Sequence, residues 1–276
     1  MQNYTKEDII AQLKEMKAPT DSVVLVHTSL RSVGQIEGGA QTLLDALIEY
    51  FTNDGGLLCV PTHTWHNFGK DFMPDMEKTD TALGAFSDIA ASDTRGVRSE
   101  HPTHSMMVFG DRKKAEEFVK DEPYITSYTS PDSCYGKLYK MGGYIMLVGV
   151  AHNRNTYLHA VEEMLKVPDR MKDTPTRFRI RKKSGEVVER ELYTFKCSFI
   201  GDISLRFVKY ETPFRYHRCI TDGFVGNAPT QLCDAVKMKE TMELIFKNSK
   251  DFDPLDGELP IEQKLYCTKS GKVERA

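Results

Sequence analysis

The fold is decided by residues 22–60, which read SVVLVHTSLRSVGQIEGGAQTLLDALIEYFTNDGGLLCV. The stretch begins with a continuous apolar run at 22–27, which is typical of a buried strand. Apolar residues then recur at helical spacing over 43–51, and a glycine-containing turn at 54–56 leads into a second apolar run at 57–60. This order of strand, helix and strand predicts a crossover unit of an α/β protein.

The remaining chain continues with alternating helices and strands. A helix capped by Thr5 is expected to end before Pro19. Further strands are expected at 105–109 and 144–150, and further helices at 82–91, 112–120, 156–166 and 230–247. Residues 175–225 are basic and β-like, with a hairpin turn at 183–186. We therefore predict a single domain over residues 1–276, with helices flanking a mixed, largely parallel β-sheet (α/β/α) and a β-rich excursion in the C-terminal third.

Composition excludes several classes of protein. With 40% hydrophobic and 28% charged residues, the chain of 276 residues has a globular balance rather than a disordered or fibrous one. The 37 basic and 40 acidic residues leave a net charge of −3, which argues against a general nucleic-acid or membrane-surface binder. No apolar run approaches the roughly 20 residues that span a bilayer, and the polar N-terminus lacks a signal peptide's apolar stretch. We expect a cytoplasmic protein, a monomer or a homodimer, with no nucleic-acid and no membrane partner.

The six cysteines lie far apart and form no CxxC pair. Structural zinc sites usually show close pairs of cysteine or histidine, and small disulfide scaffolds are far shorter than this chain. We therefore expect reduced thiols that serve mostly as packing groups.

The loop after the first strand, residues 28–34, is the first candidate site. Ligands of open α/β sheets gather where loops leave the carboxyl ends of strands. The loop matches neither a Walker loop nor GxGxxG, so nucleotide triphosphates and dinucleotides are not favoured. Its polar groups suit a phosphate or an amide-rich ligand such as pantetheine, and an ordinary capped turn is the alternative. These groups belong to Thr28, Ser29, Arg31 and Ser32.

Two histidine pairs form the second candidate, His63 with His66 and His101 with His104. Four imidazoles could bind a metal, but no carboxylate is placed with them as in HExxH. The alternative is that each ring makes a local hydrogen bond in a loop. The proline after His101 holds the backbone of that residue extended.

The third candidate begins just after the apolar run at 144–150. His159 and Glu162 are three residues apart on an expected helix and therefore share one face. A carboxylate beside an imidazole fixes its tautomer and makes it a stronger base for removing one proton from a nucleophile. A surface pair of no catalytic role is the alternative, and His159 with Glu163 has the i,i+4 spacing of two metal ligands.

Seven segments, in chain order, carry a recognisable pattern over residues 22 to about 235. They are 26–34 with 38–40 (VHxSLxxxG…GGA), 61–64 (PTxT), 98–105 (RSxHPxxS), 133–138 (near SPxGKL), 147–150 (near LLG), 155–162 (sTxxHxxE) and 226–228 (GxA). Each is weak alone, but the ordered set resembles the aminoglycoside 3-N-acetyltransferase family, which comprises acetyl-CoA-dependent antibiotic N-acetyltransferases outside the GNAT fold. The resemblance implies acetyl-CoA as cosubstrate, a small amine as partner, no metal, and a role in antibiotic resistance.

The resemblance also implies roles for individual residues. His159 would take a proton from the acceptor amine, Glu162 would orient His159, and His101 would lie near the acetyl thioester. Transfer would be direct, because no cysteine lies in a Cys-His arrangement. A backbone amide of the 28–34 loop or Thr64 would stabilise the oxyanion. The residues implied to line the pantetheine and phosphate end of CoA are Thr28, Ser29, Leu30, Arg31 and Ser32, with Arg98 and Ser99 as helpers.

The sequence also departs from the family pattern. Asn153 stands where several members carry an aspartate, and Cys134 stands where proline is usual. The loop at 66–82 differs in composition from those of resistance enzymes. Its acidic residues are either a rim for a cationic acceptor or a solvated charged loop. They are Asp71, Asp75, Glu77 and Asp80.

Three classes of function remain open from the sequence. The leading hypothesis is N-acetyl transfer to an aminoglycoside, a related amino sugar or another amine. The second is an acyl-CoA-binding protein without catalysis. The third is a metal-dependent hydrolase built on His63, His66, His101 and His104.

Overall fold

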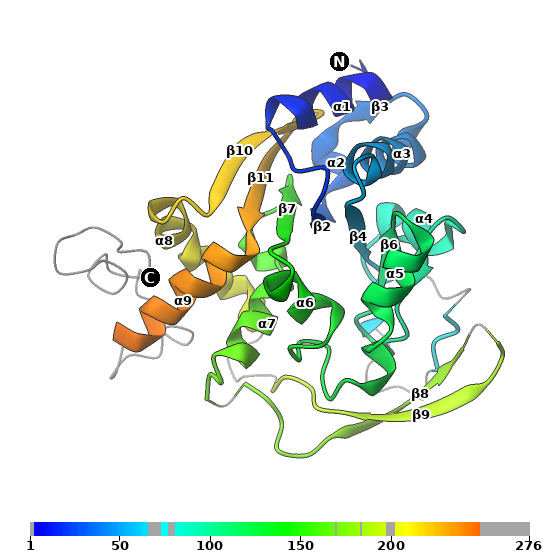
Figure 1. Cartoon of the computed structure of the whole chain (residues 1–276), viewed down its shortest axis with the longest axis vertical. Coiled ribbons are helices and arrows are strands. Elements are labelled where there is room, and N and C mark those ends of the chain that lie inside the picture. The colour runs from blue at the N-terminus through cyan, green and yellow to red at the C-terminus, as the bar shows by residue number, and fades with distance from the viewer. Residues whose placement is uncertain are drawn as a thin grey trace.

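The computed structural model describes residues 3–65, 73–76, 81–168, 170–182, 184–196 and 202–248. A seven-stranded sheet lies at the centre (Figure 1). In spatial order its strands are β10 (Ile220–Val225), β11 (Ala228–Asp234), β7 (Tyr144–Val148), β2 (Val23–Thr28), β4 (Leu57–Pro61), β6 (Met106–Phe109) and β5 (Val97–Arg98). The prediction of a mixed sheet flanked by helices is confirmed.

The sheet is less parallel than the sequence led us to expect. Only the central strands β7, β2 and β4 run parallel to one another, whereas the pairs toward both edges are antiparallel. For the outermost pair at each edge, the reason is the length of the connections. A turn at 226–227 joins β10 to β11, and residues 99–105 join β5 to β6, and links this short cannot make the crossover that parallel strands need.

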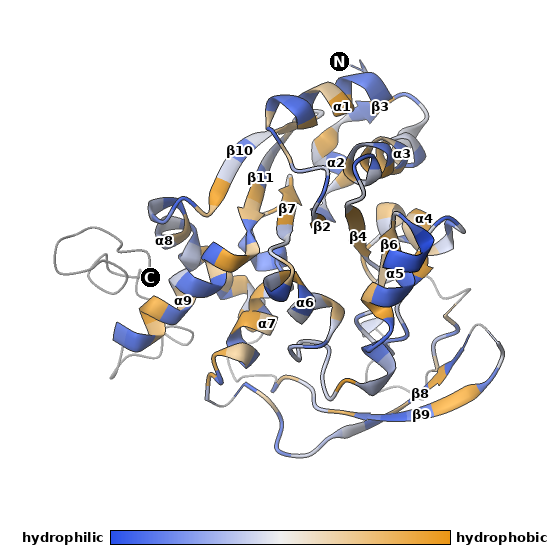
Figure 2. Ribbon diagram, in the orientation of Figure 1, coloured by the Kyte–Doolittle hydropathy of each residue, from blue (hydrophilic) through white to orange (hydrophobic). Residues whose placement is uncertain are grey.

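Two apolar cores lie on opposite faces of the sheet because successive strand residues point to opposite sides. Val24 and Val26 of β2 pack toward helices α1 (Lys6–Glu15), α3 (Gly39–Thr52) and α4 (Ala85–Ser92). Val23 and Leu25 pack toward helices on the other face, which are α5 (Arg112–Val119), α6 (Cys134–Lys140), α7 (Tyr157–Met164), α8 (Glu211–Tyr216) and α9 (Ala235–Asn248). Figure 2 shows the central strands β4 and β7 coloured mainly hydrophobic, as burial on both faces requires. The α/β/α arrangement is therefore confirmed.

A second β unit lies outside the main sheet. Strands β8 (Thr176–Arg181) and β9 (Val187–Leu192) form the expected antiparallel hairpin, which runs along the lower edge of Figure 1. Residues after β9 return to the body of the protein, where the N–H of Tyr193 donates to Thr126 O and that of Lys196 donates to Arg170 O. Phe195, in this hairpin stem of residues 193–196, packs on His159 of α7, so the stem lies beside that helix.

Other segments differ from the expected boundaries. The helix expected from residue 230 begins at Ala235, because residues 228–234 form β11 and pair with β7. Helix α6 follows Ser133, where no helix was predicted, and 203–216 are helical rather than β-like, as η4 (Ile203–Tyr210) and α8. The short elements are β1 (Asn3–Tyr4), α2 (Leu30–Val33), β3 (Gln35–Ile36), η2 (Glu122–Tyr124) and η3 (His152–Arg154).

The carboxyl ends of the parallel strands meet at one edge of the sheet. Thr28 at the end of β2 pairs with Val148 at the end of β7, and the N–H of Ser29 donates to Val148 O at 2.8 Å. Gly149 follows with φ +63°, and a Cβ there would come within 2.4 Å of Ser32 Cβ. Glycine at this position therefore lets the chain leave β7 directly against α2. No helix in the described part of the chain is long and apolar enough to cross a membrane.

Candidate active site

The centre of the site is a histidine and a carboxylate on α7. Nδ1 of His159 lies 3.5 Å from Oε2 of Glu162, so the pair that spacing predicted does share one face. Glu162 is fully buried, whereas the side chain of His159 is 12% exposed. On its other side, Glu162 Oε1 lies 3.9 Å from Arg170 Nε. A buried carboxylate requires such partners, and this one lies between an imidazole and a guanidinium.

Aromatic rings fix the plane of the His159 imidazole. The ring centroids of Phe195 and Phe207 lie 4.7 and 4.8 Å away, both edge to face, and Tyr128 lies edge-on at 6.4 Å. These rings come from the hairpin stem, from η4 and from the segment before α6. Nothing in the local sequence pattern around His159 indicated them, since they are distant in the chain.

His101 is a neutral ring with one defined tautomer. Its Nδ1 accepts hydrogen bonds from the backbone N–H of Thr103 at 3.1 Å and of His104 at 2.9 Å. Because Nδ1 is an acceptor, Nε2 carries the ring proton. Burial lowers the pKa of His101 to about 3, so the ring stays uncharged near neutral pH. Nε2 is buried and has no hydrogen-bond partner among the described residues.

His63 and His104 lie in the same cluster. His63 Nε2 hydrogen-bonds to Tyr135 Oη, and the ring of His104 lies 4.7 Å from that of His63. Burial, reinforced by neighbouring imidazoles that include His159, lowers the pKa of both rings well below the usual value. Within the described ranges, no group of three or more His, Cys, Asp or Glu residues is arranged to hold a metal ion. His66, the fourth residue of the hydrolase hypothesis, lies outside those ranges.

Two serines of the loop predicted to bind CoA hydrogen-bond to each other. Ser32 Oγ donates to Ser29 Oγ at 2.8 Å, and Ser29 caps the short helix α2. The Arg31 side chain is exposed, and Leu30 packs against the core that faces α1 and α3. Thr28 Oγ1 is buried and has no hydrogen-bond partner in the described part of the chain. Among the described residues, Thr28 and Arg31 are therefore the polar side chains of this loop that are left for a ligand.

Three residues predicted to assist CoA or the oxyanion make hydrogen bonds within the protein. Thr64 donates its hydroxyl hydrogen to Pro102 O at 2.7 Å, so that hydrogen does not face an oxyanion. Arg98 donates to Thr62 O at 3.0 Å and to Ser105 Oγ at 3.2 Å, among other contacts. Ser99 Oγ is buried and accepts from the N–H of Met106. These bonds shape the turn that carries His101, which explains why such residues accompany it in the RSxHPxxS pattern.

A comparison with known proteins identifies the family. The model of a family described as aminoglycoside 3-N-acetyltransferase matches residues 25–247. The chain belongs to that family. The match spans every described segment of the site, from within β2 to the last turn of α9.

Individual relatives of this acetyltransferase family are moderately similar. Aminoglycoside N(3)-acetyltransferase IV of Salmonella sp is 31% identical over 166 residues, which cover 60% of this chain and 61% of that protein. The chain thus spans about three fifths of the length of the curated relatives it matches. A crystal structure of AAC(3)-IVa, a histidine-to-alanine mutant in complex with apramycin, has a TM-score of 0.74 at 26% identity and covers 92% of this chain and 96% of that one. AAC-IIIb in a binary complex with CoASH has a TM-score of 0.73 at 20% identity, with 87% and 94% covered, which shows the same fold.

The acidic rim suggested for the acetyltransferase acceptor is mostly outside the described residues. This holds for Asp71, Glu77 and Asp80. Asp75 is described, and it forms a β-bridge with Arg181 of the hairpin β8–β9. The segment at 73–76 is therefore joined to the hairpin.

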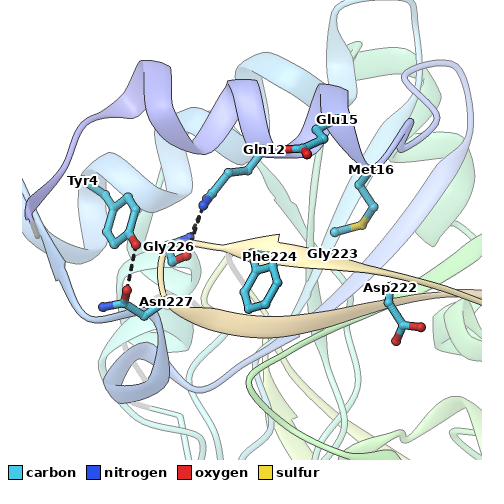
Figure 3. A pocket seen from close by; sticks show the side chains of 9 residues that line it. All are labelled: Tyr4, Gln12, Glu15, Met16, Asp222, Gly223, Phe224, Gly226 and Asn227. Carbon is cyan, nitrogen blue, oxygen red and sulfur yellow. Dashed lines mark hydrogen bonds between the residues drawn. The ribbon is translucent and has the colours of Figure 1, made fainter.

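A surface groove of about 600 Å³ lies between α1 and the β10–β11 hairpin (Figure 3). Several of its polar groups bond to one another within the protein. Tyr4 Oη donates to Asn227 Oδ1, and the Gln12 amide bonds both the N–H and the carbonyl of Gly226. Two of its lining residues, Gly226 and Asn227, belong to the GxA segment, and none belongs to the segments that contain His63, His101 or His159. The lining residues are Tyr4, Gln12, Glu15, Met16, Asp222, Gly223, Phe224, Gly226 and Asn227.

Proposed function

We propose that this protein transfers the acetyl group of acetyl-CoA to an amine of an aminoglycoside or a related amino sugar. The observation that carries the proposal is the contact of His159 Nδ1 with buried Glu162 at 3.5 Å. That contact leaves Nε2 of the imidazole for the acceptor amine. At this distance the pair is an ion pair once the imidazole is protonated, rather than a short hydrogen bond.

In the proposed reaction the amine nitrogen attacks the thioester carbonyl carbon. The new C–N bond forms as Nε2 of His159 removes a proton from the amine, and Glu162 stabilises the resulting imidazolium. The tetrahedral intermediate then collapses, the C–S bond breaks, and the proton passes from His159 to the departing sulfur. The products are the N-acetylated amine and CoA with a free thiol.

We assign the oxyanion to His101. Its Nε2–H is a fixed, buried donor without a partner among the described residues, and the ring is neutral, so it donates without delivering a proton. This assignment replaces Thr64, whose hydroxyl hydrogen is engaged by Pro102 O. In this route His159 carries the transferred proton and His101 stabilises the oxyanion, and we propose no metal.

For CoA we propose the loop at residues 28–32, at the end of β2. Arg31 is an exposed cation suited to a phosphate, and Thr28 Oγ1 is a buried polar atom that a ligand amide could reach. That AAC-IIIb, which has the same fold, forms a binary complex with CoASH supports CoA as the ligand. Arg98, Ser99 and Thr64 would support the His101 turn rather than contact CoA.

The test is thiol release from acetyl-CoA over a panel of aminoglycosides, simple amino sugars and amino-acid amines. Wild-type protein should release thiol with at least one amino sugar. The variant His159→Ala should lose turnover but keep acetyl-CoA binding, measured by calorimetry. Unchanged turnover in His159→Ala would remove the assigned base. Binding of acetyl-CoA without thiol release for any amine would favour an acyl-CoA-binding protein, and release only with other amines would change the acceptor class.

A further inference from the structure

Glu163, the residue after Glu162, holds a segment on the other side of the site. Its carboxylate accepts hydrogen bonds from Ser127 Oγ, at 2.8 Å to Oε1 and 2.6 Å to Oε2, and from Thr129 Oγ1. Ser127 is 1% exposed and Thr129 is fully buried. Hydrogen bonds from hydroxyls to a carboxylate are shorter and stronger than those between neutral groups. The carboxylate therefore ties residues 127–129 firmly to α7.

Tyr128, between the two anchored hydroxyl residues, reaches the site. Its ring stacks on that of His104, with centroids 3.6 Å apart and planes inclined by 4°. The same ring meets Phe195 at 5.6 Å and lies edge-on to His159 at 6.4 Å. Since the backbone is anchored on both sides of Tyr128, the position of this ring is set from α7.

One helix therefore controls two parts of the site. His159 and Glu163 are four residues apart on α7 and lie on the same side of it. We infer that Glu163 is a positioning residue for acetyl transfer, which acts through Ser127 and Thr129 to fix Tyr128 between His104 and His159. The inference rests on the proposed function. It gives Glu163 a role different from the metal ligation that its spacing to His159 allowed.

The expected effect is on turnover rather than on CoA binding. The Tyr128 ring contacts His101 and His104 on one side and His159 on the other. Its displacement should therefore change the position of the acceptor amine relative to His159. A misplacement of 1 Å can cost about 100-fold in rate. We expect Glu163→Ala to lower kcat by about 10- to 100-fold, with little change in the dissociation constant of acetyl-CoA.

The variants separate positioning from general stability. Glu163→Gln keeps an oxygen that accepts a hydroxyl hydrogen and should restore most of kcat. The double variant Ser127→Ala/Thr129→Val should lose as much as Glu163→Ala. Combining all three changes should lose no more, because they break the same link. Glu116→Ala is the matched control, since this carboxylate forms only a surface pair with Arg112 on α5.

A second readout is independent of activity. Hydrogen exchange followed by mass spectrometry should show faster exchange over residues 126–131 in Glu163→Ala than in wild type and in Glu116→Ala. Full kcat in folded Glu163→Ala, additive losses in the combined variant, or unchanged exchange over 126–131 would each overturn the inference. Absence of turnover in wild type would instead count against the proposed function, and the exchange comparison would still decide the role of Glu163.

Discussion

Replacing Glu162 with glutamine removes the charge beside the proposed base but keeps the shape of the side chain. Glu162 is fully buried, and its Oε2 lies 3.5 Å from His159 Nδ1. When the imidazole takes a proton, it becomes a cation at that distance from a carboxylate. At an effective dielectric constant of about 20, Coulomb's law gives an attraction of about 5 kcal/mol.

The variant should lose only part of this stabilisation. The amide oxygen of glutamine keeps a dipole toward the ring, and Arg170 Nε, 3.9 Å from Glu162 Oε1, already offsets part of the carboxylate's charge. We therefore expect a loss of about 3 kcal/mol in the transition state, which corresponds to a fall in kcat of about 100-fold.

The assay is thiol release at saturating acetyl-CoA and amine, with the dissociation constant of acetyl-CoA measured separately. Glu116→Gln on the surface of α5 is the matched control and should behave as wild type. A kcat of Glu162→Gln within about threefold of wild type would refute the reasoning, since it would mean that the carboxylate does not stabilise a cation in the transition state. A loss confined to acetyl-CoA binding would refute it as well.

Two further predictions concern His101 and Glu122. The variant His101→Ala should lower kcat by about 100- to 1,000-fold, as for other oxyanion donors, and should retain acetyl-CoA binding. A small loss of kcat would contradict the assignment and favour a backbone amide as the oxyanion donor. Glu122 is buried, and burial raises its pKa from 4.5 to about 7. Because the folded pKa lies above the unfolded one, the stability due to this group is full below pH 4.5 and falls by about 3 kcal/mol as the pH rises through 7. Urea unfolding at pH 5 and pH 8 should show this loss in wild type but not in Glu122→Gln, and equal pH dependence in both would contradict the assignment.

The sequence was sufficient for features that depend on local pattern. The apolar runs at 22–27 and 57–60 and the helical spacing between them correctly predicted the parallel centre of the sheet, because a crossover helix leaves little choice of arrangement. The i,i+3 spacing likewise predicted that His159 and Glu162 are neighbours. Both relations span only a few residues or one crossover.

Features that depend on contacts between distant segments could not be predicted from local sequence patterns. The antiparallel pairing of β11 with β7 and of β6 with β4 depends on how the chain returns to the sheet after a long connection, which no local pattern encodes. The rings of Phe195 and Phe207 reach His159 from segments more than 30 residues away, and neither carries a motif. The engagement of Thr64 by Pro102 O depends on a turn nearly 40 residues later, so the hydroxyl looked available.

The low pKa values of four other histidines limit where a proton on His159 could move in the proposed reaction. Desolvation lowers the pKa values of His27, His63, His101 and His104, and neighbouring rings add to this effect in His63 and His104. A proton delivered to His159 cannot migrate to these rings at moderate pH. In the proposed reaction this proton passes from His159 to the departing sulfur. The proton taken from the amine is therefore the one that completes the thiol. In the proposed mechanism these four rings would therefore keep the transferred proton on His159 until it passes to the sulfur.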